Sequence, residues 1–376
     1  MMTLAYFVCW SCAWLLLHVF VGYPAWMWLL ARVQPLPVQK QAVTPTVTVI
    51  IAAHDGERHI RAKLDNLRAL DYPGANVDII VACDGCRDAT GALSRECGDR
   101  RVRVLEFAER RGKAACLNDA VAVARGEVLL LTDVRQKLSP TALRELVANL
   151  ADPSVGAVSG ELHLEDVTTG FAQGVDAYWR YEKLIRLSES RSGSTVGVTG
   201  ALYAMRRELF EPLPTGTVLD DVLIPMRIAA AGRRVVFEPR ALAWDQPSQQ
   251  PAEERRRKIR TLAGNYQLIQ LAPWLLWPDR NPLWFRFVSH KVLRLLAPWL
   301  LLLFAVTAAA LATRHPMYAW LLLLPLAGTA LVVVERLLPV AGRWLPVRLA
   351  VAFYYLNLFA AQALIAFTRN RGLHLW

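Results

Sequence analysis

Four long stretches of the chain lack charged residues, and they constrain its fold more than any other feature. Residues 3–31 contain no Asp, Glu, Lys or Arg, and similar apolar blocks occupy residues 295–313, 317–334 and 349–367. An apolar helix of about 18 residues or more can cross a hydrocarbon core of ~30 Å. We therefore expect an integral membrane protein with one N-terminal and about three C-terminal transmembrane helices.

The first apolar block has an alternative interpretation as a cleaved signal peptide. A signal peptide begins with a cationic segment and has a short apolar core, whereas no Lys or Arg precedes Arg32 in this chain. A retained helix is therefore expected. Cations gather on the cytoplasmic side of membrane spans. Arg32 and Lys40 follow the first block, and Arg286 and Lys291 precede the second, so the region between these blocks is predicted to be cytoplasmic.

The excess of basic residues points to a membrane surface rather than to nucleic acid. The formal net charge is +11, which suits a domain resting on anionic lipids, so membrane lipids are expected partners. A nucleic-acid-binding protein would carry its basic residues on a recognisable module, interleaved with exposed aromatics. The sequence shows no such module, and we expect no nucleic-acid partner.

Cys83 and Cys86 form a CxxC pattern, which is typical of a redox pair or of half a zinc site. Neither Cys97 nor Cys116 belongs to a second CxxC. Thiols in the cytosol stay reduced, so we interpret these cysteines as incidental thiols of a turn.

Strand and helix patterns alternate between the first two apolar blocks. Strands are expected at 46–53, 77–83, 102–107 and 127–131, with helices at 57–70 and 113–124 and a short helix ending near Leu93. This alternation predicts an α/β fold with a mainly parallel sheet and helices on both faces. Ligands of such sheets bind in the crevice at the carboxyl ends of the strands.

Acidic residues follow three of these expected strands. Asp55 ends the first strand, Asp84 the second, and Asp133 the strand at 127–131. One acid in a loop is most often a turn former. Three acids at one edge of the same sheet instead indicate a shared ligand site.

The motifs at these strand ends resemble those of a known family. Residues 46–57 (TVTVIIAAHDGE), 81–90 (VACDGCRDAT) and 111–127 (RGKAACLNDAVAVARGE) are similar to three segments of the family 2 glycosyltransferases of bacterial inner membranes. This group contains the cellulose, hyaluronan and chitooligosaccharide synthases. The resemblance covers about 45–265 and the terminal spans. It implies a GT-A (Rossmann-like) domain, although His54-Asp55 departs from the family's usual Asn-Glu.

The resemblance implies a nucleotide-sugar donor, with a UDP-sugar favoured over a GDP-sugar. Asp84 would contact the nucleotide base, Asp55 would hold the ribose, and Lys113 would contact the diphosphate. The alternative for Lys113 is a solvated helix start. Because a cation is unfavourable at a helix N-terminus, its position favours a functional role.

The segment LLLTDVRQ at 129–136 aligns with the family's Asp-x-Asp motif, whose acids bridge ribose, metal and diphosphate. Asp133 keeps the first acid, and Arg135 replaces the second. Magnesium prefers oxygen ligands, commonly one or two carboxylates plus phosphates, so this replacement weakens a metal site. Either Arg135 itself makes a forked contact with phosphate oxygens, or Asp133 and the phosphates hold Mg²⁺ or Mn²⁺ while Arg135 points away.

The segment VLDDV at 218–222 resembles the family's acid pair, in which the second acid is the general base. Asp221 would remove the proton of the acceptor hydroxyl as it attacks the anomeric carbon, inverting the linkage. Asp220 would raise the pKa of Asp221 by its like charge. The alternative is that both acids only stabilise a helix start. Asp220 and Gly200 are expected on the acceptor side.

A basic helix at 251–270 corresponds to the segment in which processive family members carry Gln-x-x-Arg-Trp. The matching residues 257–261 read Arg-Lys-Ile-Arg-Thr, so the glutamine and the tryptophan are both missing. Arg260 is expected to reach the diphosphate. Without the tryptophan that stacks the acceptor sugar, processive extrusion of a polymer is disfavoured.

These observations divide the chain into four predicted parts: 1–33, an N-terminal transmembrane helix; 45–262, the GT-A domain; 263–290, an interfacial segment; and 291–376, the C-terminal transmembrane helices. The predicted activity is inverting transfer of a hexosyl or N-acetylhexosaminyl group. The acceptor is a polysaccharide or lipid-linked glycan at the cytoplasmic face of a bacterial inner membrane, and other polysaccharide-assembly proteins are possible partners.

Two other classes of protein were considered. The Arg135 and Arg257 departures suggest a catalytically inactive scaffold subunit of an export machine as the alternative. A dinucleotide oxidoreductase would need Gly-x-Gly-x-x-Gly after the first strand. The sequence AAHDGE at 52–57 does not supply it.

Overall fold

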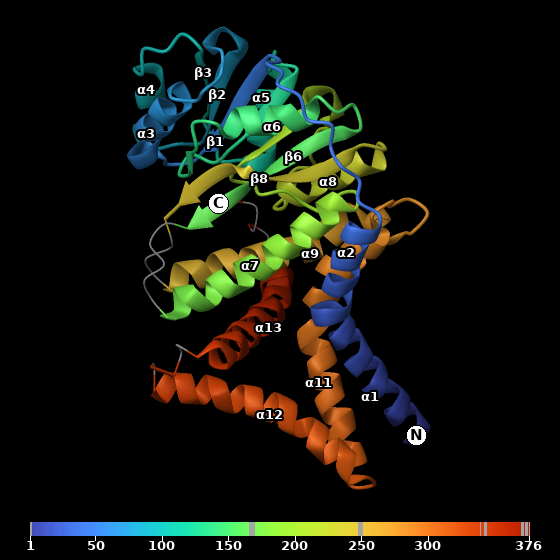
Figure 1. Cartoon of the computed structure of the whole chain (residues 1–376). Helices are drawn as coiled ribbons and strands as arrows, with labels where there is room; N and C mark the ends of the chain where they lie inside the picture. The colour runs from blue at the N-terminus through green and yellow to red at the C-terminus, as the bar shows by residue number, and fades with distance from the viewer. Residues whose placement is uncertain are drawn as a thin grey trace.

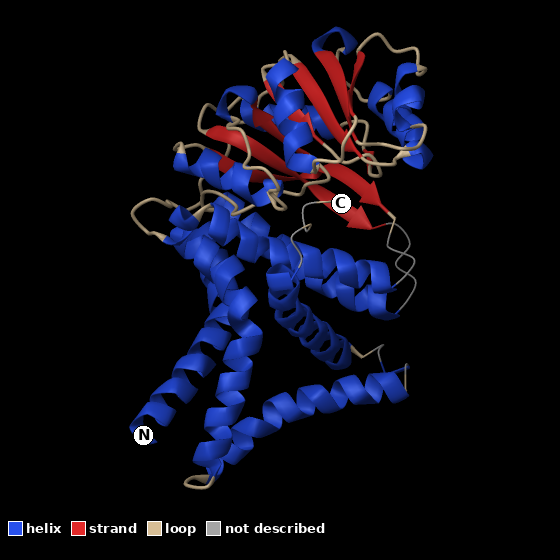
Figure 2. Cartoon of the chain, turned by 180° about the vertical axis from the view of Figure 1, so that it is seen from behind, coloured by secondary structure: helices blue, strands red, loops and turns tan. Residues whose placement is uncertain are grey.

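The chain forms an α/β domain that stands on a group of long helices (Figure 1). The computed structural model describes residues 2–164, 170–246, 251–338, 340–341, 344–369, 372 and 375. Two helices, α7 (Gly170–Arg191) and α9 (Pro251–Leu271), lie between the sheet and the long helices below it (Figures 1 and 2).

The sheet has eight strands in the order β3-β2-β1-β4-β7-β6-β8-β5. Their bounds are β1 Val47–Ala53, β2 Val77–Asp84, β3 Val102–Phe107, β4 Val128–Leu131, β5 Lys137–Leu138, β6 Val155–Leu164, β7 Tyr203–Arg206 and β8 Arg234–Asp245. The half made of β3, β2, β1 and β4 is parallel, as predicted. In the other half, β7 runs antiparallel to both neighbours and β6 parallel to β8, so the complete sheet is mixed.

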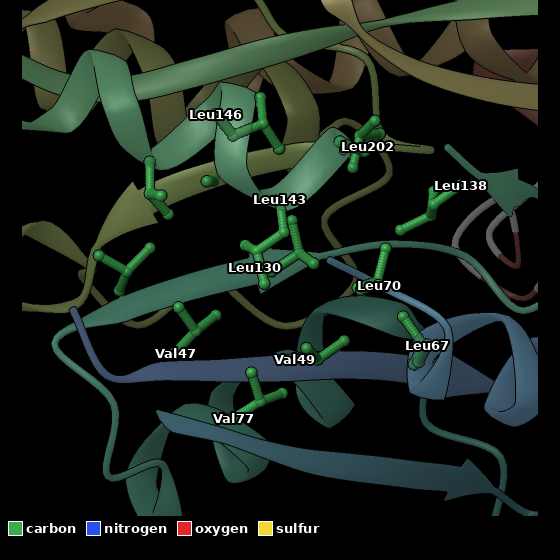
Figure 3. Packing of buried hydrophobic residues seen from close by; sticks show 14 of the residues in the cluster. Val47, Val49, Leu67, Leu70, Val77, Leu130, Leu138, Leu143, Leu146 and Leu202 are labelled. Carbon is green, nitrogen blue, oxygen red and sulfur yellow. The ribbon is translucent and has the colours of Figure 1, made fainter. Parts of the chain in front are cut away.

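Helices cover both faces of the sheet, as the alternating pattern predicts. They are α3 (Glu57–Arg68), α4 (Thr90–Arg95), α5 (Lys113–Val123), α6 (Ala142–Leu150) and α8 (Asp220–Ala230). Side chains along β1 alternate between two cores. Val49 packs with Leu67 of α3 and Leu143 of α6 on one face (Figure 3), whereas Ile50 packs with Leu117 of α5 on the other. This alternation follows from the two-residue period of a strand.

Within the described residues, four helices are long and apolar enough to cross a membrane, one near the N-terminus and three near the C-terminus. The first spans Met2–Val33, where α1 (Met2–Leu17) continues into α2 (Tyr23–Val33). The second spans Trp284–Ala312 and consists of α10 (Trp284–Phe287) and α11 (Leu293–Ala312). The others are α12 (Pro316–Leu337) and α13 (Leu345–Arg369). This count agrees with the sequence prediction.

Buried polar contacts join the first two spans to α7. The Tyr23 hydroxyl in the first span donates to the Glu189 carboxylate of α7. Glu189 also lies 2.8 Å from His290 Nδ1 of the second span. All three side chains are buried. A second connection joins α9 to the last span, where Ala263 packs against Ala363.

Candidate active site

Four charged side chains, called here the central cluster, meet where β4 ends and where α5 and α8 begin: Lys113, Asp133, Asp220 and Asp221. The Lys113 ammonium lies 3.0 Å from Asp133 Oδ1 and 3.4 Å from Asp220 Oδ2. A Cβ atom added at Gly200 would lie 3.6 Å from Asp221 Oδ2 and 3.7 Å from Lys113 Nζ. Predicted residues from four separate segments therefore lie together.

In the acid pair of the central cluster, Asp220 is buried and Asp221 is partly buried, and this raises their proton affinity. Burial, followed by the negative charge of Asp220, raises the pKa of Asp221 to about 6. Burial also raises the pKa of Asp220, against the attraction of Lys113. Burial alone would lower the pKa of Lys113, but Asp133 and Asp220 raise it, so the lysine stays charged. A carboxylate with a pKa close to the working pH is suited to general base catalysis.

Tyr203 of β7 belongs to the same place, and the sequence analysis missed it. Among the described residues its buried hydroxyl has no hydrogen-bond partner. Burial and then the charges of Asp220 and Asp221 raise the pKa of Tyr203. Buried polar atoms without partners are costly. This part of the cluster is therefore suited to a polar ligand.

The donor atoms of the central cluster fit a hard divalent cation. Asp133 and Asp220 offer carboxylate oxygens, the ligands that Mg²⁺ prefers together with phosphates. The Asp133 side chain is 32% exposed, so it is accessible to a ligand. Arg135, which stands in place of a second acid, donates to Asp245 Oδ2 at 2.6 Å. Gln136 Nε2 contacts the same oxygen at 2.9 Å.

A second residue missed by the sequence analysis holds the loop that carries Asp133. Lys63 of α3 is only 2% exposed. Its ammonium donates to Thr132 Oγ1 and to the Gln136 carbonyl, both at 2.7 Å. Burial lowers the pKa of Lys63 to about 7, although Asp133 opposes this change. Lys63 therefore holds Thr132, which precedes Asp133, and Gln136, which follows it.

Asp84 lies behind the central cluster rather than within it. The side chain is fully buried, and its two oxygens accept the backbone N–H groups of Arg111 at 2.7 Å and Gly112 at 2.8 Å. Gly112 has a φ of 91°, a conformation that favours glycine. Asp84 thus orients the turn that presents Lys113, and its contact with a nucleotide base stays a prediction.

Asp55 lies at the rim of the site, in the loop after β1. Its Oδ1 accepts the backbone N–H of Arg87 at 2.8 Å. Together with Glu57, Arg58, Arg87 and Asp88 it lines a hollow of about 450 Å³. The predicted donor residues are therefore divided between this rim and the central cluster.

Cations from α9, α7 and the second span surround the central cluster. Burial and the charge of Arg257 lower the pKa of Arg260, while Asp133, Asp220 and Asp221 oppose this change. Arg260 therefore lies within electrostatic reach of the acids, and its contact with the diphosphate stays a prediction. Arg186 of α7 donates to Thr199 Oγ1 at 2.8 Å. Lys291 and Arg186 also act on Asp221, partly opposing the rise of its pKa.

A GT-A-like sheet that gathers acids and a lysine at its strand ends defines a class of protein, the glycosyltransferases that use the GT-A fold. The family model described as "Glycosyltransferase like family 2" matches residues 45–264, which is more than half of the chain. The chain belongs to this family, so the scaffold alternative is not favoured.

Curated relatives carry related names. "Probable glycosyltransferase YdaM" of Bacillus subtilis (strain 168) is 24% identical over 292 residues, covering 70% of this chain and 66% of that protein. "Poly-beta-1,6-N-acetyl-D-glucosamine synthase" of Staphylococcus aureus (strain COL) is 21% identical over 230 residues, covering 59% of this chain and 55% of that protein. The chain thus spans less than two thirds of the length of these two relatives.

A solved structure is similar over almost the whole chain. It is "Mannosyltransferase PcManGT from Pyrobaculum calidifontis in complex with GDP-Man and Mn2+", with 25% sequence identity and a TM-score of 0.72. The similarity covers 96% of this chain and 99% of the mannosyltransferase. It therefore includes the long helices as well as the sheet domain.

Proposed function

We propose that this enzyme transfers a sugar from a nucleotide donor to a glycan or lipid-linked acceptor at the cytoplasmic face of a bacterial inner membrane, inverting the linkage. The observation that carries the proposal is the partly buried acid Asp221, with a pKa of about 6, beside a lysine held between two other carboxylates. The similarity to a mannosyltransferase with GDP-mannose and Mn²⁺ supports a nucleotide-sugar donor and makes a GDP-sugar a competitor of the UDP-sugar.

The donor would lie across the carboxyl ends of the parallel strands. Asp55 and Asp84 would serve the nucleoside, the first through its open position and the second by fixing the turn before Lys113. Lys113 and Arg260 would contact the diphosphate, which needs positive charge as it leaves. Asp133 would hold Mg²⁺ or Mn²⁺ together with phosphate oxygens, and this ion would neutralise charge on the diphosphate.

The transfer step follows from the position of the acid pair. Asp221 takes the proton of the acceptor hydroxyl, the acceptor oxygen forms a bond with the anomeric carbon, and the bond from that carbon to the diphosphate breaks. The nucleoside diphosphate leaves with the electron pair of the broken bond, opposite the incoming oxygen. Asp220 keeps the pKa of Asp221 high enough for it to accept a proton.

The location of the reaction is proposed from the sequence and supported by the arrangement of the helices. Residues 45–262 form the catalytic domain in this proposal, with 263–290 at the interface and 291–376 in the membrane. Arg260 reaches the central cluster from α9, which packs against the last span. Because the family's acceptor-stacking tryptophan is missing, we propose addition of single sugars rather than processive extrusion. Other polysaccharide-assembly proteins remain partners in this proposal.

The proposal is tested by nucleotide release from a panel of UDP- and GDP-sugars, using the purified full-length protein with Mn²⁺, Mg²⁺ or EDTA. One donor should be consumed, and Asp221→Asn should lower its turnover about 10²–10⁴-fold, the usual contribution of a general base. Asp65→Asn, at an exposed position of α3, is the matched control and should keep full activity. Wild-type protein that releases no nucleotide with any donor and acceptor would contradict the proposal and favour the inactive scaffold.

A further inference from the structure

Three side chains with metal-binding atoms meet at the rim of the site, away from the central cluster. His54 and Asp55 follow β1, and Cys86 follows β2. Their ligand atoms all lie within 4.8 Å of one another. Among these atoms, His54 Nε2 lies 3.5 Å from Asp55 Oδ2.

The hydrogen bond on the other side of the histidine ring determines its tautomer. His54 Nδ1 lies 2.7 Å from the carbonyl oxygen of Asp84. A carbonyl oxygen can only accept, so Nδ1 must carry the proton. In the neutral ring Nε2 then carries a lone pair, and this nitrogen lies 3.5 Å from a carboxylate oxygen of Asp55. A metal ion between these two atoms would be bound by both of them.

The geometry is that of a metal ligand with its outer support already in place. Metal-bound histidines almost always donate their other ring N–H to a carbonyl or carboxylate, as His54 does to Asp84. Around tetrahedral zinc, bond lengths of about 2.0–2.2 Å separate a nitrogen and an oxygen ligand by roughly 3.4 Å. The observed separation of 3.5 Å is close to this value.

The third ligand decides which metal fits. Cys86 Sγ donates to the Ala53 carbonyl at 3.4 Å, and this weak contact is given up when the thiol loses its proton to solvent on metal binding. A set of imidazole, carboxylate and thiolate suits zinc, whereas magnesium and manganese prefer oxygen alone. The rim thus suits zinc, whereas the central cluster suits magnesium or manganese.

We propose that His54, Asp55 and Cys86 form a binding site for a thiol-binding divalent cation such as Zn²⁺, separate from the Mg²⁺ or Mn²⁺ expected at Asp133. The CxxC pattern did not reveal this site because two of its ligands follow another strand, about thirty residues earlier. Three protein ligands leave a fourth position open. The ion would join the β1 loop to the β2 loop beside the hollow that Asp55 and Arg87 line.

The test is a titration of metal-free, reduced full-length protein with Co²⁺, followed by the absorption of a cobalt–thiolate bond and then by competition with Zn²⁺. One ion per chain should bind with this absorption. Cys86→Ser should abolish the absorption, and His54→Gln should weaken Zn²⁺ binding at least about tenfold. Thermal unfolding of each variant shows whether it is folded.

Matched variants separate this site from other cysteines, histidines and metals. Cys97→Ser and His59→Gln should bind Co²⁺ like the wild type, and Asp133→Asn should keep the cobalt–thiolate absorption. Absence of that absorption in the wild type, or its persistence in Cys86→Ser, would overturn the proposal.

Discussion

The central cluster and the loops beside it both contain aspartates, yet these aspartates lie in opposite surroundings. In the loops, Asp84 accepts two backbone N–H groups, and hydrogen bonds such as that from Thr90 overcome burial and lower the pKa of Asp88. At the centre, burial raises the pKa values of Asp220 and Asp221. A carboxylate held by backbone N–H groups fixes a loop in place, whereas one with a raised pKa can accept a proton from a ligand.

Substituting one aspartate from each region should give opposite results. Asp84→Ala leaves two backbone N–H groups without an acceptor, at about 1–3 kcal/mol each, so the free energy of unfolding should fall clearly. Asp133→Ala should keep the melting temperature and abolish sugar transfer. This side chain is partly exposed, and its contact is with the Lys113 ammonium. Thermal unfolding and transfer assays measure both. The comparison fails if Asp133→Ala unfolds the domain while Asp84→Ala only loses activity.

The raised pKa of the central acids predicts the pH dependence of transfer. Asp221 acts only when deprotonated, so kcat/KM should rise with pH through about 6 and level off above it. Asp220→Asn removes a like charge, so this limb should move to lower pH by roughly one unit. The measurement is a pH–rate profile at saturating metal. A limb at the pH of an ordinary aspartate, unchanged by Asp220→Asn, would show that the base lies elsewhere.

A substitution of Lys63 tests whether this buried lysine positions Asp133. Lys63→Met should lower kcat/KM about tenfold, since loosening a catalytic loop by about an ångström costs up to 10²-fold. The folded pKa of about 7 is below the ordinary lysine value of 10.5. The unfolded state therefore binds more protons between these values, and wild-type stability should rise with pH there. In Lys63→Met this rise should be smaller.

Lys137, an exposed lysine of the neighbouring strand β5, provides the control for Lys63. Lys137→Met should change neither kcat/KM nor the dependence of stability on pH. Equal behaviour of the two variants would remove Lys63 from the site.

Arg135 should give the smallest effect on the reaction, because it is paired with Asp245. Arg135→Gln should change the donor Kd less than about threefold and lower the melting temperature slightly, since Gln136 still contacts Asp245. Donor binding measured with Mn²⁺ and with EDTA checks this. A donor Kd at least ten times weaker would instead show that the guanidinium contacts phosphate.

The parallel half of the sheet was predictable because each of its segments has a clear local pattern. The β-branched run of β1 predicts a strand, and the apolar spacing of α3 predicts a helix, without knowledge of what either packs against. The acids at the strand ends follow from this arrangement, since parallel strands present their carboxyl ends at one edge.

The other half was harder to predict, and the reason is visible in β6. Its sequence VGAVSGELHL breaks the apolar pattern with two glycines. A Cβ atom at Gly160 would lie 2.6 Å from the Leu202 side chain and 2.8 Å from the Ala241 carbonyl. Glycine is required here by the closeness of another strand, which no local pattern reveals. The short elements α6 and β5 were not predicted from the sequence either.

Side chains whose role depends on a distant partner were also missed. In the sequence Lys63 resembles an exposed cation of a helix, and only the fold shows that it donates to Thr132 and Gln136. Tyr203 looks like an ordinary strand residue until the acids of α8 surround it. His54 and Cys86 meet only because β1 and β2 are neighbours.

The buried contact of Tyr23, Glu189 and His290 has a consequence for the assembly of the protein in the cell. Its three members come from the start, the middle and the last third of the chain. A ribosome that has made only the sheet domain has not yet supplied the histidine, so Glu189 must wait in the nascent chain for its partner. The catalytic domain therefore reaches its final form only after the second hydrophobic helix has been inserted, which makes biosynthesis of an active enzyme depend on the insertion machinery.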